Sequence, residues 1–187
     1  AMNQEVSDFL YKIKFPFTIG YGMTECGPLI SYDHNYEYVP GSCGQVLKGI
    51  MEVRIDSDDP YNKVGEIQVR GENVMKGYYK NPQATAEVID KDGFLHSGDL
   101  GVKDPDGNFR ITGRIKDMII RGGENISPRE IEEFLYKMPG IKDVQIVAMA
   151  SPRYGEDVAA FVIPHANTDI TSEDVRDYCK DKIARYK

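Results

Sequence analysis

The sequence predicts an α+β protein built in two parts. An antiparallel β-rich, distorted barrel-like subdomain with short helices is expected over residues 1–115, and a small α+β domain over residues 116–187. In the first part, segments of alternating apolar and polar residues are separated by Asp-Gly and Asn-Pro pairs, which is typical of antiparallel sheets. In the second part, the apolar periodicity indicates a helix, two strands and another helix. The apolar content of 187 residues is sufficient for both cores.

The first part is expected to begin with an amphipathic helix over residues 3–13. Its apolar stripe, which we expect to join a core, consists of Val6, Phe9, Leu10 and Ile13. A short buried strand over residues 15–19 then leads into a loop over residues 20–28. Glycines in that loop allow the backbone to approach a ligand closely, although an ordinary turn is the alternative.

The remainder of the first part is predicted to be strands joined by tight turns. Residues 51–55 and 66–70 alternate in the manner of half-exposed strands. Asn81 is expected to cap a short helix that starts at Pro82. An Asp-Gly turn then joins two short strands into a hairpin. These strands are expected at residues 101–103 and 109–111, with the turn at Asp106-Gly107.

The boundary between the two parts is expected within residues 113–132. A charged cluster at Arg114–Asp117 precedes a short apolar strand at Met118–Ile120, which ends in a turn at Gly122-Gly123. The sequence that follows is a strong helix start. Ser127 is expected to cap the helix, Pro128 to occupy its first position, and Glu130 to complete a capping box.

The second part continues with two apolar strands and a final helix. The strands are expected within residues 144–149 and 158–163, and Thr171 is expected to cap the last helix. Its apolar face would consist of Val175, Tyr178, Cys179 and Ile183.

The overall charge and the cysteine pattern exclude several classes of protein. The net charge is −7 and no basic run exists, which argues against nucleic-acid binding. No apolar stretch approaches the ~18 residues of a membrane-spanning helix, and the start does not resemble a signal peptide. Cys26, Cys43 and Cys179 show neither disulfide-framework nor zinc-site spacing. A reducing cytoplasm is therefore expected, with peripheral membrane association left open.

Polar residues in separate loops indicate a nucleotide site. The hydroxyl of Thr24 beside the carboxylate of Glu25 could hold a phosphate oxygen and a hard cation such as Mg²⁺ together. Asp99 could accept both hydroxyls of a ribose, and Arg114 could add charge-assisted hydrogen bonds. Solvated or structural roles are the alternative, because most Asp and Arg side chains have such roles.

Three ordered motifs carry a resemblance to a known family. They are Tyr21–Glu25 (YGMTE), Gly93–Gly101 (GFLHSGDLG) and Gly113–Asp117 (GRIKD). Together they resemble signatures of the adenylate-forming, AMP-binding superfamily, which includes acyl-CoA synthetases, adenylation domains of peptide synthetases and luciferases. The resemblance covers nearly the whole chain, from about Tyr21 onward.

The resemblance implies a role for each residue of the first motif. Tyr21 and Gly22 would line the adenine and acyl-adenylate side of the site. Thr24 would contact phosphate, and Glu25 with Thr24 would help to bind Mg²⁺.

The resemblance also implies roles around the boundary. Asp99 would hold the ribose hydroxyls with Arg114 beside it. Lys116 falls where the family places the hinge about which the C-terminal domain rotates between half-reactions. Gly122 and Gly123 fall in the loop that lies along the pantetheine tunnel of CoA, with a plain β-turn as the alternative.

The family pattern is incomplete in this sequence. Its phosphate-binding loop would lie upstream and its adenylation lysine downstream, and Lys187 lacks the motif that surrounds that lysine. Asn125 also stands where some synthetases carry Arg. We therefore expect the chain to be a C-terminal fragment that does not adenylate alone and whose apolar cut surfaces self-associate.

The residues of the motifs most resemble those of long-chain fatty acid–CoA ligases, which favours such an enzyme as the parent protein. Its substrates would be a fatty acid, ATP and CoA, with Mg²⁺ as the cation. Two alternatives remain open, namely an adenylation domain that loads a carrier protein and a non-catalytic nucleotide-binding or interaction fragment.

Overall fold

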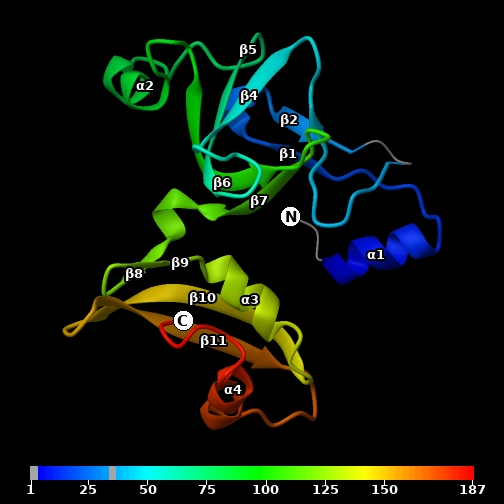
Figure 1. Cartoon of the computed structure of the whole chain (residues 1–187), viewed down its shortest axis with the longest axis vertical. Coiled ribbons are helices and arrows are strands. Elements are labelled where there is room, and N and C mark those ends of the chain that lie inside the picture. The colour runs from blue at the N-terminus through cyan, green and yellow to red at the C-terminus, as the bar shows by residue number, and fades with distance from the viewer. Residues whose placement is uncertain (1–3, 34–36) are drawn as a thin grey trace. The chain divides into compact units, whose positions relative to one another are not determined.

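The computed structural model describes residues 4–33 and 37–187. The chain divides into two compact units, Ala1–Thr112 and Gly113–Lys187, and each is described by itself. Helices and antiparallel strands occur in both units (Figure 1), so the predicted α+β class is confirmed. In the part of the chain that the structure describes, the strands form open sheets and no closed barrel.

The first unit contains two antiparallel sheets. A three-stranded sheet has the order β1-β2-β3, and a four-stranded sheet has the order β4-β5-β6-β7. The strands are β1 (Gly20–Gly22), β2 (Leu29–Tyr32), β3 (Gln45–Val46), β4 (Met51–Asp56), β5 (Gly65–Gly71), β6 (Leu95–Lys103) and β7 (Phe109–Arg114). The strands expected at 51–55 and 66–70 and the hairpin around Asp106-Gly107 are thus confirmed.

Strand β5 lies inside the four-stranded sheet and is more deeply buried than predicted. The side chains of Ile67, Gln68 and Val69 are all buried, so both faces of the strand are covered. Strand β4 keeps the expected alternation, with Met51 and Ile55 buried. Strand β5 is an inner strand of this sheet and contributes Ile67 and Val69 to the core, whereas β4 is an edge strand.

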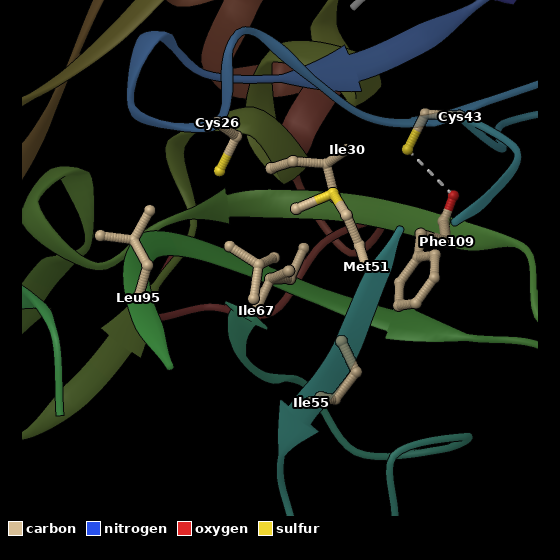
Figure 2. Packing of buried hydrophobic residues seen from close by; sticks show 9 residues of the cluster. Cys26, Ile30, Cys43, Met51, Ile55, Ile67, Leu95 and Phe109 are labelled. Carbon is tan, nitrogen blue, oxygen red and sulfur yellow. Dashed lines mark hydrogen bonds between the residues drawn. The ribbon is translucent and has the colours of Figure 1, made fainter. Parts of the chain in front are cut away.

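Apolar side chains from both sheets form one core. Figure 2 shows Cys26, Ile30, Met51, Ile67 and Leu95 pointing toward one another from different strands and from the loop after β1. At the edge of this group the thiol of Cys43 donates a hydrogen bond of 3.2 Å to the carbonyl oxygen of Phe109. The core therefore fixes the loop that carries the first motif against the strand that carries the second.

The N-terminal helix α1 (Gln4–Lys12) forms as predicted, but its apolar stripe is not in a core. The side chain of Phe9 is 59% exposed, whereas Ser7 on the other side of the helix is 1% exposed. The hydroxyl of Tyr38 donates to Oγ of Ser7 at 2.9 Å, so α1 contacts its unit through its polar side. The expected burial of the stripe is wrong because this polar contact determines which face is covered.

The strand expected over residues 15–19 is also absent. This segment is irregular, and strand β1 begins only at Gly20. Pro16 has no N–H to donate to a neighbouring strand, which disfavours regular pairing there. By contrast, α2 (Pro82–Val88) begins as predicted, with the side chain of Asn81 accepting a hydrogen bond of 3.1 Å from the backbone N–H of Ala84.

The second unit contains one antiparallel sheet of order β10-β11-β8-β9 and two helices. Its elements are β8 (Ile119–Arg121), β9 (Glu124–Ile126), α3 (Pro128–Leu135), β10 (Ile141–Ser151), β11 (Gly155–Pro164) and α4 (Ser172–Cys179). In Figure 1, α3 runs along β10. The predicted helix, strand, strand, helix order is confirmed, and the β8–β9 hairpin precedes it.

Helix starts in this unit are only partly as predicted. Pro128 opens α3, but Ser127 makes no capping hydrogen bond with its side chain, so the predicted capping box is wrong. A Cβ placed on Gly113 would lie 3.1 Å from Oγ of Ser127, which shows that this hydroxyl is turned toward Gly113. Glu130 instead forms an ion pair with Lys187. Thr171 caps α4 as predicted, within a complete capping box.

The core of the second unit lies between the sheet and the helices. Its buried members are Ile119, Ile126, Ile131, Leu135, Ile141, Val144 and Ile146. Within residues 4–33 and 37–187, no helix has the length and apolar character needed to cross a membrane.

Candidate functional site

The first motif lies in a tight connection between β1 and β2. Gly22 ends β1, and a Cβ at this position would lie 1.9 Å from the carbonyl oxygen of Pro28. The close approach of these two backbone segments therefore requires glycine. The following 3-10 helix η1 (Thr24–Cys26) buries Cys26 and leaves Thr24 exposed. Burial of Cys26 anchors this loop, while Thr24 lies at the surface.

Tyr21 connects the first motif to the second. Its hydroxyl donates a hydrogen bond of 2.8 Å to Oδ2 of Asp99, a residue that is only 5% exposed. Burial, together with the neighbouring carboxylate of Asp99, raises the pKa of Tyr21 far above its ordinary value. The phenol therefore stays protonated at neutral pH and remains a hydrogen-bond donor.

Asp99 lies in an irregular part of β6. Glu66 of β5 opposes Leu100 and Gln68 opposes His96, so the residues from Ser97 to Asp99 face only Ile67 across the ladder. Such a bulge bends the strand and changes the direction of its side chains. Here the bulge coincides with the predicted ribose-binding residue.

Glu25 is fixed by two contacts. Its Oε1 accepts a hydrogen bond of 3.0 Å from the hydroxyl of Tyr78, and its backbone carbonyl accepts one of 2.7 Å from the N–H of Met75. The pKa of Tyr78 is raised, first by its hydrogen bond to this carboxylate. Tyr78 is therefore a donor that orients the carboxylate of Glu25 beside Thr24.

The oxygen atoms around Glu25 are compatible with a Mg²⁺ ion that is held jointly by the protein and by a bound phosphate. Among the described residues, no group of three or more His, Cys, Asp or Glu side chains is arranged to hold a metal by itself. Mg²⁺ commonly takes one or two carboxylates and completes its shell with phosphate oxygens and water. Glu25 and the hydroxyl of Thr24 offer hard oxygen atoms of this kind.

The other predicted site residues belong to the second unit. Arg114 ends β7 and Lys116 is an exposed residue of the 3-10 helix η2 (Ile115–Asp117). Gly122 and Gly123 form the β8–β9 turn with φ values of +60° and +91°, and both lie at the surface. The expectation of a glycine turn is thus confirmed.

The turn at Gly122 is attached to the loop between β10 and β11. The N–H of Gly122 donates 3.0 Å to the carbonyl of Tyr154, and the guanidinium of Arg121 lies 4.2 Å from the centre of the Tyr154 ring. Arg121 also donates to Asp157 at 2.6 Å. The glycines therefore lie on a hairpin that is held in place within its own unit.

The predicted site residues are thus divided between the two units. In the first unit, Tyr21 contacts Asp99 directly, and Glu25 has Tyr78 as its partner. Arg114, Lys116, Gly122 and Gly123 all belong to the second unit. Sequence reasoning did not assign a role to Tyr78 or Glu66, because nothing in their local sequence shows which loop or strand each one contacts.

Two family profiles match the chain. The profile described as AMP-binding enzyme matches residues 1–79, and the profile described as AMP-binding enzyme C-terminal domain matches residues 130–187. The chain belongs to the AMP-binding enzyme family.

Two curated relatives with similar sequences are named as acyl-CoA synthetases or synthases. One is a protein of Bacillus subtilis (strain 168) that carries the provisional name acyl-CoA synthetase YngI. It is 42% identical over 190 residues, and the alignment covers 91% of this chain and 32% of the relative. Another is feruloyl-CoA synthase of an Amycolatopsis species, 41% identical over 178 residues, with 91% and 36% covered. The chain therefore spans about a third of the length of the curated relatives it matches.

A solved structure shows the same fold. O-succinylbenzoate coenzyme A synthetase from Bacillus subtilis, in complex with ATP and magnesium ion, aligns with a TM-score of 0.84 and 30% identity. The alignment covers 99% of this chain and 39% of that one.

Proposed function

We propose that this chain is part of an AMP-forming acid–CoA ligase. The reaction would begin with attack of a carboxylate on the α-phosphate of ATP, giving an acyl-adenylate and pyrophosphate. The thiol of CoA would then attack the acyl carbon, giving the thioester and AMP with loss of the thiol proton. The contact of Tyr21 with Asp99 carries this proposal, because it joins two family motifs at one carboxylate.

Asp99 is proposed to bind the ribose of the nucleotide. A carboxylate has several acceptor positions, so Asp99 can accept from Tyr21 and from ribose hydroxyls at the same time. Its burial strengthens such hydrogen bonds, since the local dielectric constant is lower than that of water. Tyr21 and Gly22 would line the adenine and acyl-adenylate side of the same site.

Thr24 and Glu25 are proposed to hold the phosphate and Mg²⁺. Thr24 would donate its hydroxyl to a phosphate oxygen, and Glu25 would supply a carboxylate oxygen to the cation. When bound, Mg²⁺ offsets the negative charge that develops on the phosphates. Tyr78 would keep the carboxylate of Glu25 turned toward this position.

The second unit is proposed to serve the second half-reaction. We propose that residues 1–115 belong to the larger N-terminal domain and residues 116–187 to a small mobile C-terminal domain. Lys116 would be the hinge, Arg114 would contact the nucleotide, and Gly122 with Gly123 would line the path of the pantetheine arm. The exposure of Lys116 next to the division after Thr112 supports the hinge role.

Two classes of acid are candidates for the substrate. The residues of the motifs favour a fatty acid. Several relatives, however, are named for aromatic acids, among them 4-coumarate–CoA ligase 1 of Arabidopsis thaliana at 38% identity. A panel containing both classes, assayed with the full-length parent protein, distinguishes them. Transfer to a carrier protein remains the alternative to free CoA, because both reactions use the same motifs.

A chimera tests the proposed ligase. The C-terminal region of O-succinylbenzoate CoA synthetase that aligns with this chain would be replaced by the chain, and ATP–pyrophosphate exchange and thioester formation would be measured with a panel of acids. We expect both activities in the chimera and no exchange by the chain alone. A folded chimera without either activity would overturn the proposal.

The same chimera tests the ribose role. Asp99→Ala should raise the KM for ATP about tenfold, since a buried hydrogen-bond acceptor for the ribose is lost. Glu52→Ala, which removes an exposed carboxylate on β4, is the matched control. An unchanged KM in Asp99→Ala would contradict the assignment.

A further inference from the structure

The bulge in β6 leaves backbone groups that the ladder itself cannot pair. Because Ser97, Gly98 and Asp99 together face only Ile67 on β5, their N–H and C=O groups need other partners. An unpaired buried amide or carbonyl costs free energy comparable to a lost hydrogen bond. The side chains that replace the missing ladder bonds therefore determine the shape of the bulge.

Glu66 and Ser97 supply these partners. Oε1 of Glu66 accepts a hydrogen bond of 3.0 Å from the N–H of Gly98. Oγ of Ser97 donates to the carbonyl oxygen of Ile67 and accepts from the N–H of Asp99 at 3.1 Å. Gly98 has a φ of +70°, a conformation that few residues other than glycine adopt. The amides before and at Asp99 are thus both held by side chains.

The second oxygen of Glu66 is also engaged. Oε2 lies 2.7 Å from Nδ1 of His96 and accepts from Nε2 of Gln68 at 3.1 Å. Oε1 of Gln68 in turn accepts from Nε of Arg54 at 2.7 Å. The side chain of Glu66 is 14% exposed, so this carboxylate is largely removed from water and fixed by donors on both oxygens.

A fixed bulge gives Asp99 its direction. Directly after the amide held by Glu66, the side chain of Asp99 accepts the hydrogen bond from Tyr21. We infer that Glu66, together with Ser97, is a positioning residue that holds the bulge and so aims the carboxylate of Asp99 at the nucleoside. This inference rests on the proposed function for its ligand, a ribonucleotide, and on the geometry alone for the bulge.

Two readouts on the whole chain test the role of Glu66. The first is amide hydrogen exchange measured by NMR, with Gly98 as the reporter and the buried central residue Val69 as the reference. The second is titration with AMP, followed through the amide signals of Gly98 and Asp99. Glu66→Ala removes the acceptor. Glu52→Ala is the matched control, since Glu52 is a strand carboxylate of the same sheet that pairs with Arg70.

In Glu66→Ala, we expect exchange at Gly98 to become about tenfold faster relative to Val69, the change that corresponds to one lost hydrogen bond to a charged group. Affinity for AMP should also fall about tenfold, because a displaced Asp99 carboxylate would lose a hydrogen bond to the ribose. Glu66→Gln, which keeps an acceptor oxygen for Gly98, should retain most of the protection and serves as the test if the alanine variant does not fold. Glu52→Ala should resemble the wild type in both readouts.

The two proposals fail in different ways. If both Glu66 variants leave exchange at Gly98 and the signals of Asp99 unchanged, the positioning role is overturned whether or not AMP binds. If Gly98 loses protection in Glu66→Ala but AMP affinity is unchanged, the bulge is merely structural and the inference is again overturned. If the wild-type chain shows no response to AMP while Gly98 loses protection, the ribose role fails and Glu66 still holds the bulge.

Discussion

The hydroxyl of Tyr21 donates a hydrogen bond of 2.8 Å to Oδ2 of Asp99, which lies 78 residues further along the chain. Tyr21 belongs to strand β1 of the three-stranded sheet, and Asp99 to the bulge in β6 of the four-stranded sheet. The bond therefore links the two sheets of the first unit at the position where two family motifs meet. A contact between residues so distant in sequence depends on the shared core beneath them.

Removing this hydrogen bond should destabilise the first unit. Tyr21→Phe keeps the ring but leaves the buried carboxylate of Asp99 without this donor, which should cost about 1–3 kcal/mol in the free energy of unfolding. Urea denaturation of the chain measures the change. Tyr79→Phe is the control, because the side chain of Tyr79 is 88% exposed. Equal stabilities of the two variants would show that the bond contributes nothing.

Lys116→Pro should separate the two half-reactions in the chimera. Proline fixes φ and removes the backbone N–H, so rotation about this residue should be blocked. Pyrophosphate exchange should stay near the parent rate, while thioester formation falls about tenfold or more. Lys137→Ala, on the surface beyond α3, is a control for the loss of a lysine. Equal loss of both activities in Lys116→Pro would refute the hinge assignment.

The buried carboxyl of Asp33 should make the first unit less stable above about pH 6 than in acid. Burial, opposed in part by a hydrogen bond from the N–H of Val39, raises the pKa of Asp33 from 3.8 to about 6. Its Oδ2 is buried without a hydrogen-bond partner among the described residues. Because the folded state binds this proton more tightly than the unfolded state, stability falls as pH rises from about 3.8 to about 6 and stays lower above that range.

Asp33→Asn should remove this penalty. At pH 8 we expect the Tm of the first unit to rise by about 2–4 °C, since loss of the buried charge outweighs the cost of burying an amide. The advantage should shrink as the pH falls through 6 and vanish near the ordinary pKa of Asp. Thermal melts across pH 4–8 check this prediction, and a difference independent of pH would contradict it.

A cavity-creating substitution in one core should destabilise only the unit that contains that core. Ile67→Ala in the first unit and Ile126→Ala in the second each remove a fully buried side chain, which should cost about 2–5 kcal/mol. Hydrogen exchange resolved by residue should show the loss of protection concentrated in the unit that carries the substitution. Loss spread equally over both units by either variant would contradict the division after Thr112.

Elements that depend on near neighbours could be predicted from the sequence. Asn81, Pro128 and Thr171 start helices where expected, because capping and a fixed proline φ act within one helical turn. The alternation of β4 and the Asp106-Gly107 hairpin turn follow from equally local patterns. The family motifs are also short runs of neighbouring residues, so the sequence alone is enough to locate them.

Predictions failed where a distant group competed with a local one. The hydroxyl of Ser127 is turned toward Gly113 and Glu130 pairs with Lys187, so the capping box does not form. The apolar stripe of α1 is exposed because Ser7 and Tyr38 determine which side of the helix is covered. Periodicity shows that a face is apolar, but it does not show what that face contacts.

By itself, the sequence determined the α+β class, the order of most elements, the family and the residue types available for a nucleotide site. The tertiary structure alone decided that Tyr21 donates to Asp99, that Tyr78 orients Glu25, and that Glu66 holds the bulge before Asp99. The physical reason is range. Propensities and caps act over a few residues, whereas the direction of a functional carboxylate depends on strand register and on hydrogen bonds between distant segments.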